Sequence, residues 1–395
     1  MLNNYEPKVP LVFKKYERKF LKNFRYILCF ICILLLLLFL FWHESPIQQG
    51  QGFLQRGKKQ LQKYPETVLA QLDDKYTNWS LTDEIKEQLW EAIQKSPINK
   101  KTGRHYLMVF LSNEGMIEYT LNSLCSIKHA GVEKNKRITI ALDQEAYDKL
   151  KNIDEPVILF EKNFTKKLVN NYKLVDFYNI VKIRPTIVHQ FLLWNTEFIH
   201  SDSDIVYLKN PLEVFNDEAD YEVQCDSKEY YQIPYKRMPV PWQVNLGFYK
   251  VHPSPVLLKL LPLCLKGMYE EPRRHDQSVM RKILKPYPTT WLNEDTVIVN
   301  TSTLLGEDTP NITYRFLDPM IVTNAGGLYK EGHDDWKNEA KRRNIDMPTL
   351  VHFFHIGHSR EKKIVMTDNN LWFVDKQNKC VKKKPKGAIE FQAWQ

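Results

Sequence analysis

Two aspartates one residue apart, Asp202 and Asp204, stand in the segment FIHSDSDIVYLKNP between two apolar runs. Carboxylates inside a fold repel each other and lose hydration unless a positive group lies between them. Side chains at positions i and i+2 just beyond a strand end can point into one pocket and bind a hard divalent cation through oxygen. Mg²⁺ takes few protein ligands and several from a substrate, so two phosphates would complete such a shell. A solvated turn after a strand is the plainer alternative.

The elements that must position this pair begin near residue 105, where short apolar runs start to alternate with amphipathic stretches. The pattern predicts strands over residues 105–112, 137–143, 156–160 and 197–204. It predicts helices over residues 116–131, 144–152 and 180–195, the last with Pro185 near its first turn. This alternation is typical of the α/β class, with a mostly parallel sheet and right-handed crossovers. Ligands bind such sheets at the carboxyl ends of the strands, which is where Asp202 and Asp204 fall.

Seven segments between residues 105 and 375 resemble segments of one known protein family, in the same order. In chain order they are ITIALD, HSDSDIVYLKNPLEVF, VNLGFYKV, DQSVMRKIL, FLDPMIVTNAGGLY, VHFFHIGHSREKK and NNLWFVD. Together they resemble the nucleotide-diphospho-sugar transferase family, the group that includes retaining α-xylosyl- and α-galactosyltransferases of the GT-A type. The resemblance implies a GT-A-like catalytic domain over residues 105–395, a Rossmann-type sheet flanked by helices.

The resemblance also implies a set of metal ligands. Asp202 and Asp204 resemble the pair that binds Mn²⁺ together with the ribose and diphosphate of the donor. His352 matches a C-terminal histidine of the family, and a neutral imidazole suits Mn²⁺ beside two carboxylates. The sequence departs from the family here, because Phe354 replaces a common Asn and the following loop is shorter. His355 is therefore an alternative metal ligand, and either histidine could belong to the core instead.

Further donor-binding and catalytic residues follow from the same likeness. Lys362 aligns with a basic residue that suits the departing β-phosphate. Asn245 and Gly247 match a block that borders the sugar, although a plain strand-end turn would also explain the glycine. Asp276 and Gln277 match a pair expected near the transferred sugar or the acceptor hydroxyl, with a helix-start acid as the alternative.

Two more places near the expected pocket carry polar residues. Ser112 and Asn113 end the first predicted strand, where the uracil and ribose of a donor should lie. Lys182 and Arg184 flank the start of the helix before the aspartate pair and could reach a diphosphate. We expect a solvated basic face at these two positions.

These residues predict a glycosyltransferase that moves a sugar from a nucleotide-diphosphate donor, most simply a UDP-sugar, to a hydroxyl of a glycan or glycoprotein. Mn²⁺ is the expected cofactor, with Mg²⁺ possible, and the resemblance implies retention of anomeric configuration. One alternative is a non-catalytic, membrane-tethered protein that binds sugar nucleotides, which Phe354 would favour. The other is a luminal metal-dependent phosphohydrolase, for which the chain shows no further cluster of acids and histidines.

The N-terminal region predicts a membrane anchor. Residues 1–26 are basic, and residues 27–42 are free of charges and helix breakers. We interpret them as a cytosolic tail and an uncleaved signal anchor that crosses the lipid bilayer once, which makes a type II protein of the Golgi membrane. Residues 43–104 would form a luminal stem, whose helix-like segment TDEIKEQLWEAIQK could instead pack on the catalytic part. About half of the net charge of +9 lies in the tail, so we expect no nucleic-acid partner.

A luminal location gives meaning to the sequons and cysteines. Glycan acceptor sequons occur at Asn78, Asn163, Asn300 and Asn311. The cysteines beyond the apolar span are Cys125, Cys225, Cys264 and Cys380, and they allow three pairings in an oxidising compartment.

Overall fold

The computed structural model describes residues 81–160, 175–226, 244–329, 333–354, 356 and 359–381. The expected cytosolic tail, the anchor, two sequons (Asn78 and Asn163) and His355 lie outside these ranges. Across the described ranges, no helix is both long and apolar enough to span a bilayer. The membrane topology therefore stays a prediction.

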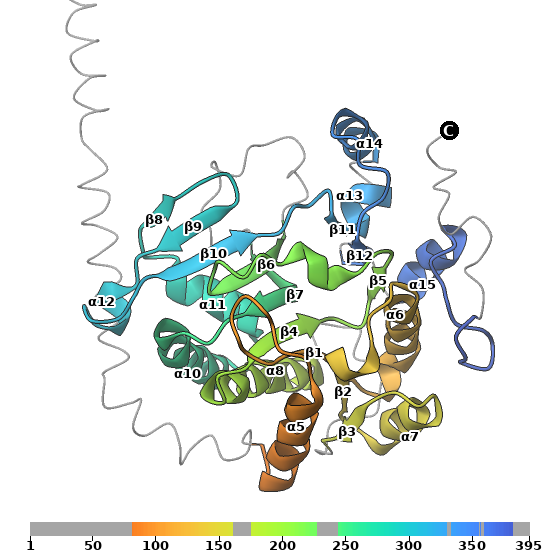
Figure 1. The fold of residues 1–395 in the computed structure, drawn as a ribbon, viewed down its shortest axis with the longest axis horizontal. Helices are drawn as coiled ribbons and strands as arrows, with labels where there is room; N and C mark the ends of the chain where they lie inside the picture. The colour runs from red at the N-terminus through yellow and green to blue at the C-terminus, as the bar shows by residue number, and fades with distance from the viewer. Residues whose placement is uncertain are drawn as a thin grey trace, which may run out of the picture. The chain divides into compact units, whose positions relative to one another are not determined.

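The strands form two sheets (Figure 1). The large sheet has nine strands in the order β3-β2-β1-β4-β7-β6-β10-β9-β8. Its strands are β1 (Tyr106–Ser112), β2 (Arg137–Ala141), β3 (Val157–Leu159), β4 (Glu197–Ser201), β6 (Tyr221–Cys225), β7 (Val244–Val251), β8 (Thr289–Trp291), β9 (Thr296–Val299) and β10 (Ile312–Phe316). The small sheet has the order β11-β12-β5 and consists of β5 (Ile205–Tyr207), β11 (Val322–Asn324) and β12 (Leu350–His352).

The α/β class is confirmed, but the expectation of a mostly parallel sheet is wrong. The four predicted strands correspond to β1–β4, which pair in parallel as expected. Strand β7 then pairs antiparallel with both β4 and β6, and β9 pairs antiparallel with β8 and β10. The large sheet is therefore mixed, because the strands after β4 do not follow the strand-helix-strand alternation that makes a sheet parallel.

Helices cover both faces of the large sheet. The described helices are α5 (Asp83–Lys95), α6 (Ile117–His129), α7 (Gln144–Asn152), α8 (Val175–Leu193), α10 (Pro255–Glu270), α11 (Asp276–Leu284), α12 (Ser302–Leu305), α13 (Ala325–Tyr329), α14 (His333–Arg342) and α15 (Ser359–Asp368). Figure 1 shows α8 and α10 side by side beneath β4. Along β1, Leu107 and Val109 join one hydrophobic core, whereas Met108 and Phe110 join the other. Successive side chains of a strand point to opposite faces, so the sheet separates two cores.

The local signals explain where the predicted helices end. Helix α6 stops just before Gly131, whose φ of 84° lies in the left-handed region that favours glycine. Helix α7 begins after Asp143, whose side chain caps the Ala146 N–H at 2.8 Å. Pro185 was expected near the first turn of its helix, and this is wrong, because α8 already begins at Val175 and places Pro185 in its interior.

The helix expected in the stem is packed on the fold. Helix α5 buries Ile85, Leu89 and Ile93 in the same core as the sheet. These residues are spaced by four, so they lie on one face of the helix. Of the two alternatives for this segment, the structure therefore shows the packed helical arm.

One disulfide joins α6 to the C-terminal segment. Cys125 and Cys380 are bonded, with their Cα atoms 5.3 Å apart, while Cys225 and Cys264 are buried thiols. Nearby, the Asn122 amide donates to the Leu371 carbonyl at 3.1 Å and accepts from the Phe373 N–H at 2.5 Å. Both contacts hold the segment that follows α15 against α6.

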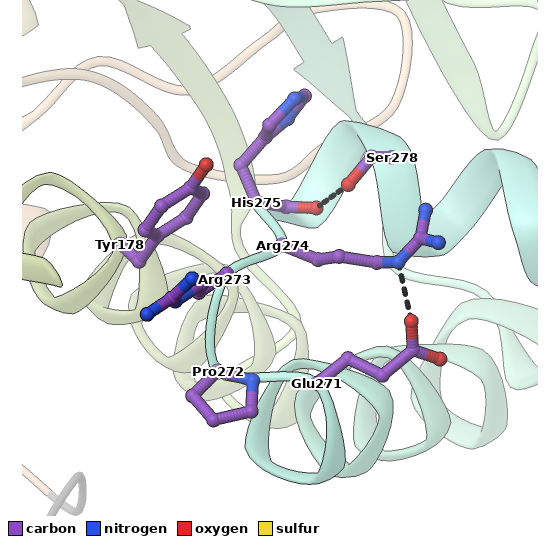
Figure 2. Close-up of a pocket in the computed structure, with 7 residues that line it drawn as sticks. All are labelled: Tyr178, Glu271, Pro272, Arg273, Arg274, His275 and Ser278. Carbon is purple, nitrogen blue, oxygen red and sulfur yellow. Dashed lines mark hydrogen bonds and ion pairs between the residues drawn. The ribbon is translucent and has the colours of Figure 1, made fainter. Parts of the chain in front are cut away.

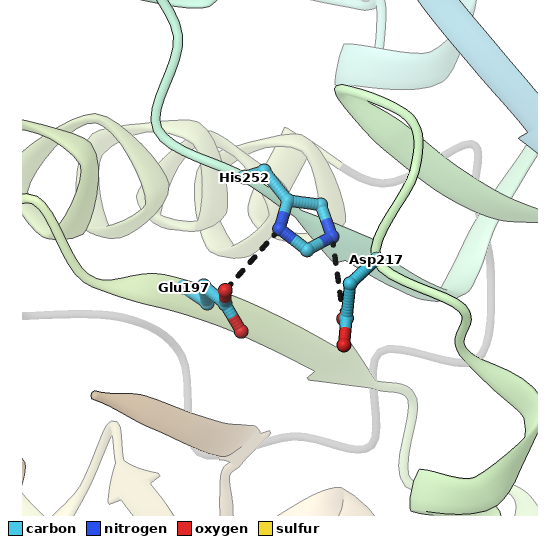
Figure 3. Close-up of side chains that lie close together, drawn as sticks. All are labelled: Glu197, Asp217 and His252. Atoms are coloured by element: carbon cyan, nitrogen blue, oxygen red, sulfur yellow. Dashed lines mark ion pairs between the residues drawn. The ribbon is translucent and has the colours of Figure 1, made fainter. Parts of the chain in front are cut away.

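A buried charge cluster lies at the start of β4, away from the aspartate pair. Figure 3 shows the side chains of Glu197, Asp217 and His252 converging there. The amino group of Lys250 lies 2.7 Å from Glu197 and also contacts Asp217. His252 donates toward Glu222, with its Nε2 3.2 Å from that carboxylate. An ammonium group and an imidazole thus supply the positive charge that these carboxylates need, so the arrangement is a structural ion cluster.

We expect His252 to make the stability of the fold depend on pH. Burial lowers the pKa of His252, but hydrogen bonds to Glu197 and Glu222 outweigh it and raise the pKa above its ordinary value. The contribution of His252 to the free energy of unfolding is therefore complete below about pH 6.5, the pKa of an unfolded histidine. It is lost as the pH rises through the pKa of His252 in the folded chain. Urea unfolding of the wild type and of His252→Gln should show the largest difference in free energy near about pH 5.5 and a smaller one near about pH 8.5. A difference that grows with pH would contradict this assignment.

Candidate active site

The aspartate pair lies where the chain passes from the large sheet to the small one. Strand β4 ends at Ser201, and β5 begins at Ile205, directly after Asp204. Strand β12 pairs antiparallel with β5, which places His352 opposite Ile205. The Phe353 N–H donates to the Asp204 carbonyl at 2.9 Å and fixes this register. Strand pairing thus brings a histidine beside two aspartates that are distant from it in sequence.

The three predicted metal ligands come together. Single ligand atoms of Asp202, Asp204 and His352 all lie within 4.8 Å of one another. The Nε2 atom of His352 is 3.7 Å from Asp202 Oδ2 and 3.4 Å from Asp204 Oδ1. Two carboxylate oxygens and one imidazole nitrogen are a donor set that suits Mn²⁺, with Mg²⁺ favoured by the oxygens alone. Phe354 stands where the family commonly has Asn. Its ring packs edge-on to the His352 ring, with the two ring centroids 4.7 Å apart, and leaves this donor set intact.

Gly247 lines the space between these ligands. A Cβ atom at this position would lie 2.1 Å from His352 Cε1 and 2.7 Å from Asp202 Oδ2, which is closer than real contacts allow. The Gly247 carbonyl accepts from the Asp202 N–H at 2.7 Å, so β7 also holds the backbone of the pair. The absent side chain therefore makes room for the cluster, and the residues present fit a bound cation.

We expect Gly247→Ala to weaken metal binding strongly. The added methyl group must push the His352 ring and the Asp202 carboxylate apart. Mn²⁺ affinity should therefore fall by a factor on the order of a hundred, the upper end of the range seen when residues that support metal ligands are changed. Isothermal titration of the purified chain with Mn²⁺ measures this. As a control, Gly247→Ala/His352→Ala should regain part of the thermal stability, since the closest clash, with the His352 ring, is gone, without regaining affinity. Unchanged affinity in Gly247→Ala would refute the steric argument.

Positive groups surround both carboxylates. Burial raises the pKa of Asp202, but the hydrogen bond from His200 and the charge of Arg184 lower it below its usual value. Burial likewise raises the pKa of Asp204, but the charge of Lys362 outweighs that effect and lowers the pKa strongly. The Lys362 amino group is 2.6 Å from Asp204 Oδ2. Both carboxylates are therefore ionised, as cation binding requires.

Arg184 is buried in the site, so the expectation of a solvated basic face at Lys182 and Arg184 is wrong. Each of these two residues is only 7% exposed. The Arg184 guanidinium binds both oxygens of Asp276, at 2.6 and 2.5 Å, and its Nη1 lies 3.3 Å from Asp202. Burial lowers the pKa of Arg184, but the Asp276 charge reverses that effect and raises it. Residue Asp276 is thereby joined to the aspartate pair through one arginine.

Asp226 is a site residue that the sequence analysis missed. Its carboxylate accepts from Asn245 at 2.9 Å and from Gln277 at 3.3 Å, and it also contacts Arg281. The oxygen ends of the two amides face β7, where Asn245 accepts from the Gly247 N–H at 2.8 Å and Gln277 from the Leu246 N–H at 2.9 Å. These contacts hold Asn245 and Gln277 in place behind Gly247. A carboxylate directly after a strand, as Asp226 is after β6, was the available signal.

Ser112 and Asn113 lie at the end of β1, as predicted. The Ser112 hydroxyl is 2.8 Å from that of Thr120, which donates to Ser203 at 2.9 Å, so a chain of hydroxyls leads to the residue between the two aspartates. The Asn113 Oδ1 caps a short 3₁₀ helix (Glu114–Met116) through the Met116 N–H. Its buried Nδ2 has no hydrogen-bond partner among the described residues. That donor is available to a ligand.

A pocket of about 600 Å³ opens immediately before Asp276 in the chain. Figure 2 shows Tyr178 of α8 facing the segment between α10 and α11, from which the Arg273 side chain extends to below the tyrosine ring in this view. Arg274 pairs with Glu271, whereas Arg273 is exposed and forms no ion pair with the residues that the structure describes. The pocket thus joins an aromatic ring and a guanidinium next to the buried Arg184–Asp276 pair.

The profile of the nucleotide-diphospho-sugar transferase family matches residues 134–366, more than half of the chain. This span contains the aspartate pair, Gly247, the Asp276–Gln277 pair and His352. The chain therefore belongs to the nucleotide-diphospho-sugar transferase family.

A relative and two solved structures are also similar to the chain. It is 21% identical over 292 residues to the UDP-galactose:fucoside alpha-3-galactosyltransferase of Dictyostelium discoideum, which covers 68% of this chain and 43% of that protein. The chain thus spans less than half the length of this relative. Mouse xyloside xylosyltransferase 1 in its apo form has a TM-score of 0.35 at 13% identity, covering 64% of this chain and 98% of that one. The bifunctional glycosyltransferase WbbM has a TM-score of 0.39 at 13% identity, covering 65% and 47%.

Proposed function

We propose that this chain transfers a sugar from a UDP-linked donor to a hydroxyl of a glycan or glycoprotein, with Mn²⁺ as its cofactor. We further propose that it does so in the Golgi lumen as a single-pass type II membrane protein. The observation that carries the proposal is the donor set of Asp202, Asp204 and His352 around the space left by Gly247. Such a set beside a basic side chain suits a diphosphate ester bound through a divalent cation.

The leaving group is the part of the reaction that this site serves most directly. Asp202, Asp204 and His352 would hold the cation, which when bound neutralises charge that develops on the departing diphosphate. The Lys362 amino group, 2.6 Å from Asp204, adds a second positive charge on the same side. Donors placed before the reaction stabilise developing charge without reorganising, so no proton transfer to the leaving group is needed.

The donor sugar would lie beside β7 and the start of α11. Asn245 and Gln277 are fixed there by Asp226, and Asp276 is fixed by Arg184. We propose that Asp276 and Gln277 contact the sugar or the attacking hydroxyl. Retention of anomeric configuration follows from the family likeness and is part of the proposal.

The acceptor would enter through the pocket that precedes Asp276. Tyr178 offers a ring face on which a sugar can stack, and Arg273 offers hydrogen-bond donors. The sequence relative is named for UDP-galactose and a fucoside, so these are the first donor and acceptor to test.

The experiment is incubation of the purified chain with a panel of nucleotide sugars, with and without Mn²⁺, while UDP release is recorded. We expect slow, Mn²⁺-dependent hydrolysis of one UDP-sugar, accelerated by an acceptor glycan. UDP-sugar binding without turnover on any acceptor would favour a non-catalytic scaffold. Release of inorganic phosphate or UMP that no acceptor accelerates would favour a phosphohydrolase.

A further inference from the structure

Gln224 touches the side of His352 that faces away from the aspartates. Its Oε1 lies 2.8 Å from His352 Nδ1, and the two residues are 1% and 2% exposed. We propose that Gln224 is a positioning residue that keeps the hydrogen of His352 on Nδ1, so that Nε2 presents a lone pair toward Asp202 and Asp204. This inference rests on the proposed metal site.

The direction of this hydrogen bond is fixed by a backbone group. An amide side chain can be turned over, which would exchange its donor and acceptor ends. Here the Nε2 of Gln224 donates to the Thr323 carbonyl at 3.4 Å. A carbonyl can only accept, so the turned amide would set two oxygens against each other. The Gln224 oxygen must therefore face His352, and an oxygen can only accept from Nδ1–H.

The hydrogen-bonded residues His352, Gln224 and Thr323 all lie on strands. Thr323 lies on β11 and His352 on β12, and these strands pair in parallel with Thr323 opposite Val351. Gln224 lies on β6, where the pairing with β7 shifts register between Val223 and Gln224. An interruption of the pairing of this kind re-aims side chains, as β-bulges do beside active sites. The two hydrogen bonds of Gln224 thus connect the large sheet to the small one.

The chemical consequence lies at Nε2. A neutral imidazole carries one hydrogen, so a hydrogen held on Nδ1 leaves Nε2 as the acceptor. That atom is the one 3.4 Å from Asp204 and 3.7 Å from Asp202. With the hydrogen on Nε2 instead, the ring would offer no lone pair to a cation between the carboxylates. Partners of this kind around a ligating histidine tune metal affinity by factors of about 10 to 100.

The first test reads the tautomer in the chain without metal. Nitrogen NMR of histidine-labelled protein distinguishes protonated from unprotonated ring nitrogens, and His352→Gln assigns the signal. In the neutral ring of the wild type we expect Nδ1 protonated and Nε2 unprotonated. Gln224→Glu should keep that state, because a neutral carboxylic acid can accept from Nδ1 with one oxygen and donate to the Thr323 carbonyl with the other, whereas Gln224→Met should shift the hydrogen toward Nε2. An unprotonated Nδ1 in the wild type would overturn the inference, whether or not Gln224→Met folds.

The second test reads Mn²⁺ affinity by electron paramagnetic resonance. Gln224→Met should weaken binding about 10- to 100-fold, with Gln224→Glu much closer to the wild type. Gln144→Met, on the exposed start of α7, is the matched control and should bind normally. Equal affinity in Gln224→Met and the wild type would overturn the inference. If the NMR result holds but even the wild type binds no Mn²⁺, the proposed function fails while the tautomer assignment stands.

Discussion

Asp204→Asn is expected to abolish Mn²⁺-dependent sugar transfer, with a loss of roughly a thousand-fold in kcat/KM. Asp204 has one oxygen toward His352 and the other 2.6 Å from the Lys362 amino group. Its replacement removes a negative ligand and leaves Lys362 without its counterion. Charge stabilisation at a metal site is worth several kcal/mol, and about 4 kcal/mol corresponds to this loss. Initial rates of UDP release at varied Mn²⁺ measure it.

A matched substitution separates charge from position. Asp346 also pairs with a lysine, Lys209 at 2.9 Å, but its side chain is 81% exposed. Asp346→Asn should therefore leave both activity and metal binding unchanged. Full activity of Asp204→Asn, or an equal loss in Asp346→Asn, would refute the assignment of the aspartate pair.

Arg184→Met is expected to lower the free energy of unfolding by about 3–5 kcal/mol. The substitution leaves the buried carboxylate of Asp276 without its bidentate partner and removes a donor from the Leu246 carbonyl, which accepts from Arg184 at 2.7 Å. Removing one partner of a buried pair is costly because an uncompensated charge remains. Urea unfolding followed by circular dichroism measures the change.

Two further variants test this explanation. Arg184→Met/Asp276→Leu should recover most of the stability, because the unpaired charge is gone. Lys209→Met breaks a surface pair and should cost at most about 1 kcal/mol. A loss in Arg184→Met no larger than that of Lys209→Met would show that the buried pair contributes little.

The first half of the fold was predictable because its signals are local. Strands β1, β2 and β4 are buried runs bounded by helices whose caps, such as Asp143 and Gly131, can be read in the sequence. The second half was not, since β11 and β12 have three residues each, and β12 gains its place only by pairing with β5, which is distant in sequence. The antiparallel insertion of β7 beside β4 is likewise a long-range choice.

The site shows the same division. Asp202 and Asp204 are close in sequence, so their spacing allowed either a cation site or a solvated turn. The family likeness favoured the cation and added His352. Arg184 was misjudged because its partner Asp276 is 92 residues away. A basic residue is expected to be solvated unless the carboxylate that neutralises its charge in the folded chain is known.

The disulfide joins Cys125 and Cys380, which are 255 residues apart in sequence, and so closes a covalent ring of main chain. The site residues Asp202, Asp204, Gly247, Asp276 and His352 are all part of this ring. A single break of the main chain inside this ring leaves both pieces attached. Nicked protein would migrate at full mass on a gel until a reductant is added, so purity should be judged under reducing conditions and function assayed without them.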